Sequence, residues 1–354
     1  MAETRALVKS LFSLTKPRVV VLLQITAMCA ILSHDLIEAN KINQSTLEVM
    51  MIVFIGGYLT AGGANCINMW YDRDIDPIMT RTSKRPLSVG DITPKKALLF
   101  GISISIIGTL WLLKMANEVA AFWALFSILF YVFIYTIWLK RTSVQNIVIG
   151  GIAGSTPPVI GWAAAEGELE LGFSSAHDFI DSIVNIGGYM PWFMFLLIFL
   201  WTPPHFWALA LYRSGEYEKV GVPMMPNVKG KGRTLVEMKI YSILLILLSL
   251  TTPLAFQEKG NSIDLSDLDS NIYLAVINSL ILSIWYVLTV WKINIDDEND
   301  IMPTASHSFL VSLTYLAVMF MILVLTSINF IIKGSIVSTV LVLYIIFRKR
   351  GGKE

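Results

Sequence analysis

The stretch Val49–Tyr71 reads VMMIVFIGGYLTAGGANCINMWY and contains no charged residue. A helix needs about 20 predominantly apolar residues to cross the hydrocarbon core of a bilayer, so this stretch predicts a transmembrane helix. The chain continues directly as DRDIDPIMTRTSKRP, from Asp72 to Pro86, and mixes acids with cations. A charged loop is therefore predicted at the end of a membrane helix, where carboxylates are costly and usually functional.

Composition extends this interpretation to the whole chain of 354 residues. Hydrophobic residues make up 55% and charged residues only 15%, against about 25% charged in a soluble domain. A nucleic-acid-binding protein usually carries a clear excess of basic residues. The formal net charge here is only +1, so no nucleic-acid partner is expected. Cys29 and Cys66 lie inside apolar stretches without CxxC spacing and indicate neither a disulfide framework nor a zinc site. The composition predicts an integral membrane protein.

Uncharged or nearly uncharged runs define the expected architecture. They must be helical, because unpaired backbone groups are too costly in lipid and no alternating barrel pattern appears. The fold class predicted is an all-α integral membrane protein, with nine transmembrane helices bundled around a central cavity. A short tenth span, Gly334–Phe347, is left open. We expect one domain over residues 1–354, with a core of about 16–332 and a C-terminal extension of 333–354. The nine runs are Val19–His34, Val49–Tyr71, Ala97–Leu113, Val119–Leu139, Thr142–Ala165, Ser182–Tyr212, Ile240–Gln257, Ser270–Trp291 and Ile301–Ile332.

The basic residues predict the orientation. With a cytoplasmic N-terminus and ten crossings, 23 of the 27 Lys and Arg residues lie on the cytoplasmic side. Cytoplasmic loops carry such an excess, whereas acidic residues contribute little to the rule. The loops Asp72–Lys96 and Arg213–Lys239 are then cytoplasmic, and the acidic loop Glu166–Asp181 lies outside.

Three residues around the end of the second run suggest a metal site. If the helix continues, Asn68, Asp72 and Asp76 recur at i, i+4 and i+8 and share one face. Their oxygens form a hard site that suits Mg²⁺, which is usually shared with substrate phosphates. The plain alternative is a polar loop with balanced charge. Nearby cations suited to neutralising a diphosphate favour the metal site; they are Arg81, Lys84 and Arg85.

The same stretch resembles a known family when it is taken with three further blocks. The blocks are Asn68–Leu87 (NMWYDRDIDPIMTRTSKRPL), Tyr135–Gly151 (YTIWLKRTSVQNIVIGG) running on to Gly154–Trp162 (GSTPPVIGW), Trp201–Ala210 (WTPPHFWALA), and Glu216-Tyr217 leading to Gly221–Pro226 (GVPMMP). Together they are similar to the UbiA-type intramembrane prenyltransferases. The DRDID and PPHFW motifs resemble those of the haem-using branch of that family.

This resemblance implies an activity, which we state as an expectation. An enzyme of that branch transfers a farnesyl group from farnesyl diphosphate to a vinyl group of protohaem IX to make haem O, with Mg²⁺ as cofactor. The implied partners are farnesyl diphosphate, protohaem IX and the lipid bilayer, together with haem A synthase or a terminal oxidase assembly pathway. The implied location is the cell (inner) membrane of a prokaryote. Two alternatives stay open: another prenyl acceptor such as a quinone precursor, and an ion-coupled transporter. The transporter ranks last, because its acids would more often lie near the bilayer midplane.

The resemblance also implies roles for individual residues. The expected catalytic residues are Asp72 and Asp76, and the expected metal ligands are Asn68, Asp72, Asp76 and Glu216. The expected diphosphate-binding residues are Arg73, Arg81, Lys84, Arg85, Lys140 and Arg141. The expected haem contacts are His205 and Asn146.

Several of these roles have a plainer alternative. Lys140 and Arg141 also suit positive-inside anchors. Many family members repeat DxxxD in the second loop, but here the i+4 partner of Glu216 is a valine. A full second metal site is therefore in doubt, and water-mediated binding by Glu216 is the alternative. His205 is either a haem contact or a packed core histidine. Pro203 and Pro204 predict a break in the helix before it.

Overall fold

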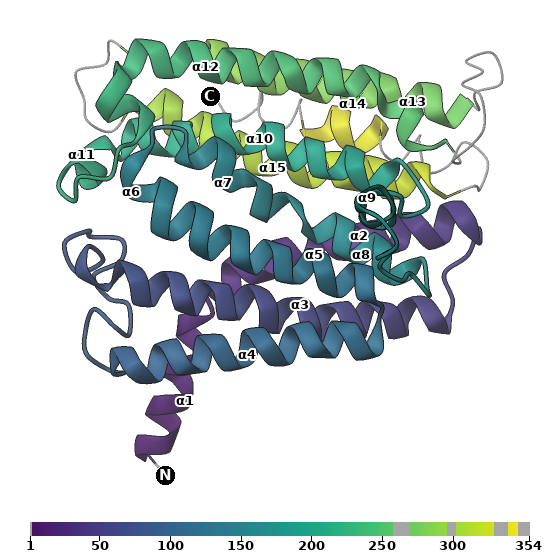
Figure 1. Ribbon diagram of the computed structural model, residues 1–354. Coiled ribbons are helices and arrows are strands. Elements are labelled where there is room, and N and C mark those ends of the chain that lie inside the picture. Colours follow the sequence, from purple (N-terminus) through teal and green to yellow (C-terminus); the bar gives the residue numbers. More distant parts are fainter. Residues whose placement is uncertain (1, 258–269, 296–301, 329–338, 346–354) are drawn as a thin grey trace.

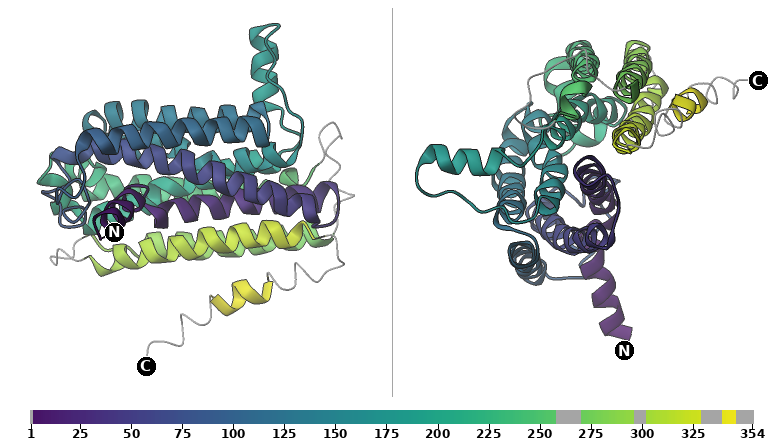
Figure 2. Two further views of the ribbon diagram at one scale, coloured as in Figure 1. Left: turned by 90° about the horizontal axis from the view of Figure 1, so that it is seen from below. Right: turned by 90° about the vertical axis from the view of Figure 1, so that its right-hand side faces the viewer.

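The computed structural model describes residues 2–257, 270–295, 302–328 and 339–345. Within these ranges the chain is helical and forms no strand, which confirms the all-α prediction. Most of the helices run side by side as one bundle (Figure 1), whereas α1 and α9 project away from it (Figure 2). The elements up to the middle of the chain are α1 (Ala2–Leu14), α2 (Pro17–Glu38), α3 (Gln44–Tyr71), η1 (Asp72–Asp74), α4 (Pro94–Met115), α5 (Glu118–Leu129), η2 (Phe130–Leu139), α6 (Lys140–Thr142), α7 (Asn146–Ser155) and α8 (Pro157–Ala165). The later elements are α9 (Ala176–Val184), α10 (Met190–Tyr212), α11 (Ser214–Glu218), α12 (Met225–Leu250), α13 (Thr252–Ala255), α14 (Ser270–Trp291) and α15 (Pro303–Thr326).

Eight helical segments in the described part of the chain are long and apolar enough to cross a membrane. The predicted run Ile240–Gln257 is not among them, because it falls on the second half of α12 and on the short α13. The first half of α12 is polar, so its apolar length is small. The predicted count of nine is therefore not confirmed. Of the tenth run, Gly334–Phe347, only residues 339–345 lie within the described ranges, and these are helical.

Close helix packing depends on small residues, as is common in membranes. On α3, a Cβ atom added at Gly63 would lie 2.7 Å from the carbonyl oxygen of Gly101 on α4. On α8, a Cβ added at Gly161 would lie 2.4 Å from the carbonyl oxygen of Ala27 on α2. These approaches are too short for any side chain, so glycine at these positions allows the helix backbones to touch.

The chain connections place the charged loops together. The loop after α3, the short α6 and α11 lie at one end of the bundle, on the left in Figure 1. We call this the site end. There Ile75, from the loop after α3, packs in one cluster with Val222 and Met224 from the loop after α11. The loop after α3 and the loop after α11 therefore pack against each other at the site end.

Two local predictions about helix continuity are wrong. Helix α3 ends at Tyr71 and a 3₁₀ turn covers Asp72–Asp74, so Asp76 lies in the following turns. The proline at position 77 and the need to turn the chain back toward α4 account for this end. Helix α10, by contrast, continues through Pro203 and Pro204. Neighbouring helices pack on both sides of α10 and hold it in place although the prolines remove two backbone donors.

Candidate active site

Asp72 is the centre of a buried polar cluster at the site end. Its side chain is completely buried, although it lies just past the end of a membrane helix. Atom Oδ2 accepts hydrogen bonds from Nδ2 of Asn68 at 3.0 Å and from Nζ of Lys140. Atom Oδ1 has no hydrogen-bond partner in the described structure, and Nη2 of Arg141 lies 3.8 Å away. One oxygen of a buried carboxylate is thus left with unused acceptor capacity.

Asn68 lies one turn before Asp72 and connects three elements. Its Nδ2 also donates to Oγ1 of Thr136 at 3.1 Å, and its Oδ1 accepts from Nζ of Lys16 at 2.7 Å. Thr136 and Lys140 belong to the widened π-helical turns of η2 and the residue that follows. Such turns are frequent at functional sites. The side-chain oxygen of Asn68, predicted as a metal ligand, is therefore used by a lysine.

Lys16 is a site residue that the sequence analysis did not identify. It precedes α2 and is half-buried, and desolvation, followed by the charges of Arg85 and Lys140, lowers its pKa to about 7. The negative charges of both Asp72 and Asp76 act in the opposite direction. All five charged groups therefore lie close enough to interact. In the sequence, only the position of this lysine at the start of a membrane helix sets it apart.

Asp76 forms the second half of the cluster although it is not on the helix. The residue is 2% exposed, and Nη1 of Arg85 lies 2.8 Å and 2.6 Å from its two carboxylate oxygens. Its backbone N–H donates to the carbonyl of Asp72 at 2.9 Å, and Oγ1 of Thr82 donates to its own carbonyl at 2.7 Å. The loop, rather than a helix face, brings the two carboxylates to one place.

The predicted diphosphate-binding cations divide into separate groups. Lys140 and Arg85 contact the carboxylates directly, whereas Arg73 and Arg141 lie beside a cavity of about 300 Å³ together with Trp70, Tyr71 and Asp74. Nη1 of Arg73 donates to the Trp70 carbonyl at 2.7 Å and its guanidinium lies 4.8 Å from the Trp70 ring centre.

Arg141 links this cavity to the cluster. Its guanidinium makes two 2.7 Å bonds to Asp74 and stacks over the Tyr71 ring at 4.7 Å. Its 3.8 Å approach to Asp72 places it between the cavity and the buried carboxylates. Of the predicted diphosphate-binding cations, only Arg141 both lines the cavity and approaches Asp72.

Arg81 and Lys84 are exposed on the loop between the carboxylates and α4. Burial raises the pKa of the Tyr217 hydroxyl, and the positive charge of Arg81 opposes that rise. Arg81 is therefore near α11. Glu216, the neighbour of Tyr217, pairs with Arg213 at 3.0 Å across one helical turn. The loop after α3 and helix α11 therefore lie close together, but Glu216 pairs with Arg213 of its own segment rather than with a residue of the loop after α3.

The two predicted haem contacts are both buried. Asn146 begins α7, and its Nδ2 donates to the carbonyl of Ser143 at 2.7 Å and of Pro223 at 3.3 Å, so it joins two site-end loops. His205 lies deeper on α10, with Nδ1 2.6 Å from Oγ of Ser312 on α15. It precedes Tyr212, the last residue of α10, by about 10 Å of helix rise. Contact of either residue with haem stays a prediction.

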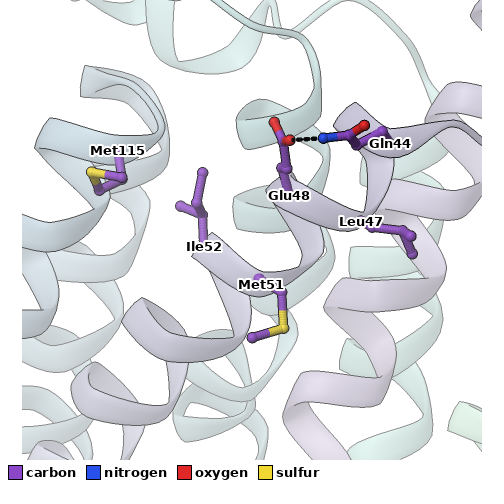
Figure 3. A pocket seen from close by; sticks show the side chains of 6 residues that line it. All are labelled: Gln44, Leu47, Glu48, Met51, Ile52 and Met115. Carbon is purple, nitrogen blue, oxygen red and sulfur yellow. Dashed lines mark hydrogen bonds between the residues drawn. The ribbon is translucent and has the colours of Figure 1, made fainter.

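A larger cavity, of about 460 Å³, lies far from the carboxylates (Figure 3). Its walls come from the first turns of α3 and the last residue of α4, and Nε2 of Gln44 donates to Oε1 of Glu48 at 2.9 Å at its rim. Helix α3 has 28 residues, so Gln44 is separated from Asp72 by roughly 40 Å of helix rise. This cavity cannot take part in chemistry at the site end.

The side chains at the site suit Mg²⁺ only if water and substrate phosphates supply its remaining ligands. In the described residues, no three or more His, Cys, Asp and Glu side chains gather into a metal-binding group. Two buried carboxylates remain, and one of their oxygens has no partner. Mg²⁺ keeps waters and substrate phosphates and is commonly bound through one or two carboxylates. The pair therefore suits an ion that is shared with a phosphorylated substrate rather than one enclosed by protein.

Comparison with known proteins agrees with this geometry. The UbiA prenyltransferase family model matches residues 22–310. The protoheme IX farnesyltransferase of Bartonella tribocorum is 40% identical over 319 residues, which cover 89% of each chain. The enzyme of the same name from Symbiobacterium thermophilum is 45% identical over 244 residues, 69% of this chain and 74% of the other.

Solved structures share the fold. A digeranylgeranylglyceryl phosphate synthase superposes with a TM-score of 0.65 at 17% identity and covers 93% of this chain and 100% of its own. A UbiA homolog from Archaeoglobus fulgidus bound to DMAPP and Mg²⁺ gives 0.57 at 15% identity, with 91% and 100% covered. On the family match and the close sequence relatives together, this multi-pass membrane protein belongs to the UbiA prenyltransferase family.

Proposed function

We propose that this protein transfers a farnesyl group from farnesyl diphosphate to a vinyl group of protohaem IX and so makes haem O. The names of relatives that are 40% and 45% identical support the choice of substrates. The observation that carries the reaction type is the buried pair Asp72 and Asp76, each in contact with a cation at the end of a membrane helix. An amphiphilic diphosphate can reach such a site with its chain still among apolar helices.

The proposed metal ligands are Asp72 and Asp76. Asn68 and Glu216 are weaker candidates, since Lys16 occupies the side-chain oxygen of Asn68 and Arg213 pairs with Glu216. Bound Mg²⁺ would supply positive charge that stabilises the departing diphosphate. The Mg²⁺ complex of the Archaeoglobus relative supports a metal in this family.

The side chains of this chain would act on the two ends of the breaking bond. The C1–O bond of the allylic diphosphate breaks and its electron pair leaves with the diphosphate, whose oxygens Lys140, Arg85 and Arg81 would hold. The vinyl group attacks the resulting allylic cation to form the new C–C bond. Water then adds to the cation left on the former vinyl group and releases a proton. The surrounding apolar helices would keep water from the prenyl cation before that step.

The proposal includes a location. The site end would face the cytoplasm, with the protein in the cell membrane of a prokaryote, and the excess of Lys and Arg on the predicted cytoplasmic side supports this. A link to haem A synthase or to terminal oxidase assembly rests on the resemblance alone.

The test is a reconstituted reaction. Purified full-length protein in lipid is incubated with protohaem IX, farnesyl diphosphate and Mg²⁺, and the pigment is analysed by mass spectrometry for haem O. Parallel reactions replace protohaem with 4-hydroxybenzoate, a quinone precursor, and farnesyl diphosphate with its C10 and C20 counterparts. We expect haem O with the C15 donor and loss of product with EDTA. Prenylated 4-hydroxybenzoate without haem O would replace the proposed acceptor with the quinone alternative.

A further inference from the structure

The imidazole of His205 is enclosed on both faces. The Trp201 ring stacks on it with a centroid distance of 4.1 Å and an angle of 20°, and Phe309 does so at 4.5 Å and 22°. The Phe206 ring meets it at 88° and 5.3 Å. Only the edge of the imidazole is left for polar contacts. The two ring nitrogens on that edge therefore decide what this residue can do.

Ser312 determines the state of one nitrogen. Its hydroxyl donates to the Phe309 carbonyl at 2.6 Å. A serine hydroxyl has a single hydrogen, so toward His205 the same oxygen acts as acceptor. With the hydroxyl hydrogen directed at Phe309, Nδ1, which lies 2.6 Å from that oxygen, carries the ring hydrogen. No carboxylate in the described part of the chain pairs with His205, and a charged imidazole among membrane helices is costly. The ring is thus neutral and its Nε2 is unprotonated.

Nε2 has no hydrogen-bond partner among the described residues, and it is not completely sealed. None of the described residues donates to it, and it is not among the fully sealed polar atoms without a partner, such as Nε1 of Trp207. His205 as a whole keeps 6% exposure. An unprotonated ring nitrogen without a protein partner can serve as a metal ligand.

We propose that Ser312 is a positioning residue that holds His205 in the Nδ1–H tautomer, so that Nε2 can bind the iron of the haem acceptor. Histidines that bind metals generally donate their other ring N–H to a fixed acceptor, which sets the tautomer and the ring orientation. Here a serine oxygen is that acceptor, and Trp201 and Phe309 prevent ring rotation. The iron-ligand part of this inference rests on the proposed function, whereas the tautomer does not.

The first measurement needs no haem. Protein labelled with ¹⁵N-histidine is studied by NMR in lipid, and the His205 signals are assigned from their loss in His205→Gln. We expect a protonated Nδ1 and an unprotonated Nε2 in the wild type. Ser312→Ala should shift the protein toward the other tautomer, and Ser312→Thr should restore the original. A protonated Nε2 in the wild type would overturn the inference whatever the substrate is.

A matched control lies one turn earlier on the same helix. Ser308 is completely buried and its hydroxyl has no hydrogen-bond partner, so Ser308→Ala removes the same atom without touching His205. The Ser312 backbone carbonyl accepts from Nε1 of Trp201 at 2.8 Å, a bond that the alanine variant retains. Ser308→Ala should leave the tautomer unchanged. An equal change in both alanine variants would mean general loosening and would overturn the positioning role.

The second measurement tests the ligand. Ferric protohaem is titrated into wild type, Ser312→Ala, Ser312→Thr and Ser308→Ala, and absorbance and electron paramagnetic resonance spectra are recorded. We expect about tenfold weaker binding and an altered spectrum only in Ser312→Ala. Identical spectra and affinities in all four proteins would refute iron binding by Nε2. Absence of any protohaem binding would instead refute the proposed function, while the NMR result would still decide the tautomer.

Discussion

Replacing Asp72 by asparagine tests the site most directly, because the chain offers a matched control two residues away. Asp72 is completely buried, whereas the Asp74 side chain is 57% exposed and pairs with Arg141 at the surface. Asp72→Asn and Asp74→Asn make the same chemical change in one DRDID run. A metal-binding role requires that only the first change removes activity.

The expected magnitudes differ strongly. Loss of one charge-stabilising group at a reacting centre costs about 10²- to 10³-fold in rate, and loss of a metal ligand at Asp72 should reach at least that. Removing the charge of Asp72 also leaves Lys140 without its partner. Breaking a fully buried pair costs about 3–5 kcal/mol, and the partial exposure of Lys140 should reduce this. The exposed pair of Asp74 contributes only about 0.2–1 kcal/mol, so Asp74→Asn should keep near-normal activity.

A third variant separates catalysis from stability. In Asp72→Asn with Lys140→Met, no buried charge lacks a partner, so thermal stability should recover relative to Asp72→Asn alone. Activity should not recover with stability, because both Asp72 and Lys140 belong to the proposed site. Initial rates of haem O formation are measured against Mg²⁺ concentration and corrected for folded protein by size-exclusion chromatography. Near-normal rates for Asp72→Asn at limiting Mg²⁺, or recovery of activity in the double variant, would refute the metal-ligand assignment.

Three further predictions concern other parts of the chain. Arg85→Gln removes the guanidinium that contacts both oxygens of Asp76 and should raise the KM for farnesyl diphosphate at least tenfold; an unchanged KM would exclude Arg85 from diphosphate binding. A tag within residues 83–92 should react only from the cytoplasm and one within 166–181 only from outside, as measured by labelling of intact cells; the reverse pattern would invert the topology. Gly161→Ala should lower the melting temperature in lipid by several degrees, because its Cβ would meet the α2 backbone at 2.4 Å; an unchanged value would show that the two helices can separate.

Much of the helical architecture can be predicted from charge-free runs alone. The run Ser270–Trp291 coincides with α14, and the run ending at Tyr71 ends where α3 ends. Hydrocarbon length and the cost of charge in lipid leave little freedom at such boundaries. The expected span Ile240–Gln257 is not confirmed, because this run is divided between the second half of α12 and the short α13.

The candidate site is harder to predict, because its contacts join distant parts of the chain. Asp72 and Asp76 are recognisable from composition and spacing, although the helix expected to align them stops before both. Lys16 contacts Asn68 from 52 residues away, and Thr136 does so from 68 residues away. Nothing local in the sequence marks either residue, since a lysine before a membrane helix and a threonine within one are ordinary. Only packing of α2, α3 and η2 brings them together.

The pattern of ion pairs suggests how the site is kept stable before substrate binds. Two buried carboxylates would strongly repel each other and cannot remain charged in apolar surroundings without compensation. Lys140 and Arg85 provide this compensation, one for each carboxylate. The carboxylates would hold the metal and the cations would hold the phosphate oxygens, so that each charge would keep a partner of opposite sign. The cations that compensate the buried carboxylates are therefore also those that would bind the leaving group, and they come both from the loop after α3 (Arg85) and from the residue after η2 (Lys140).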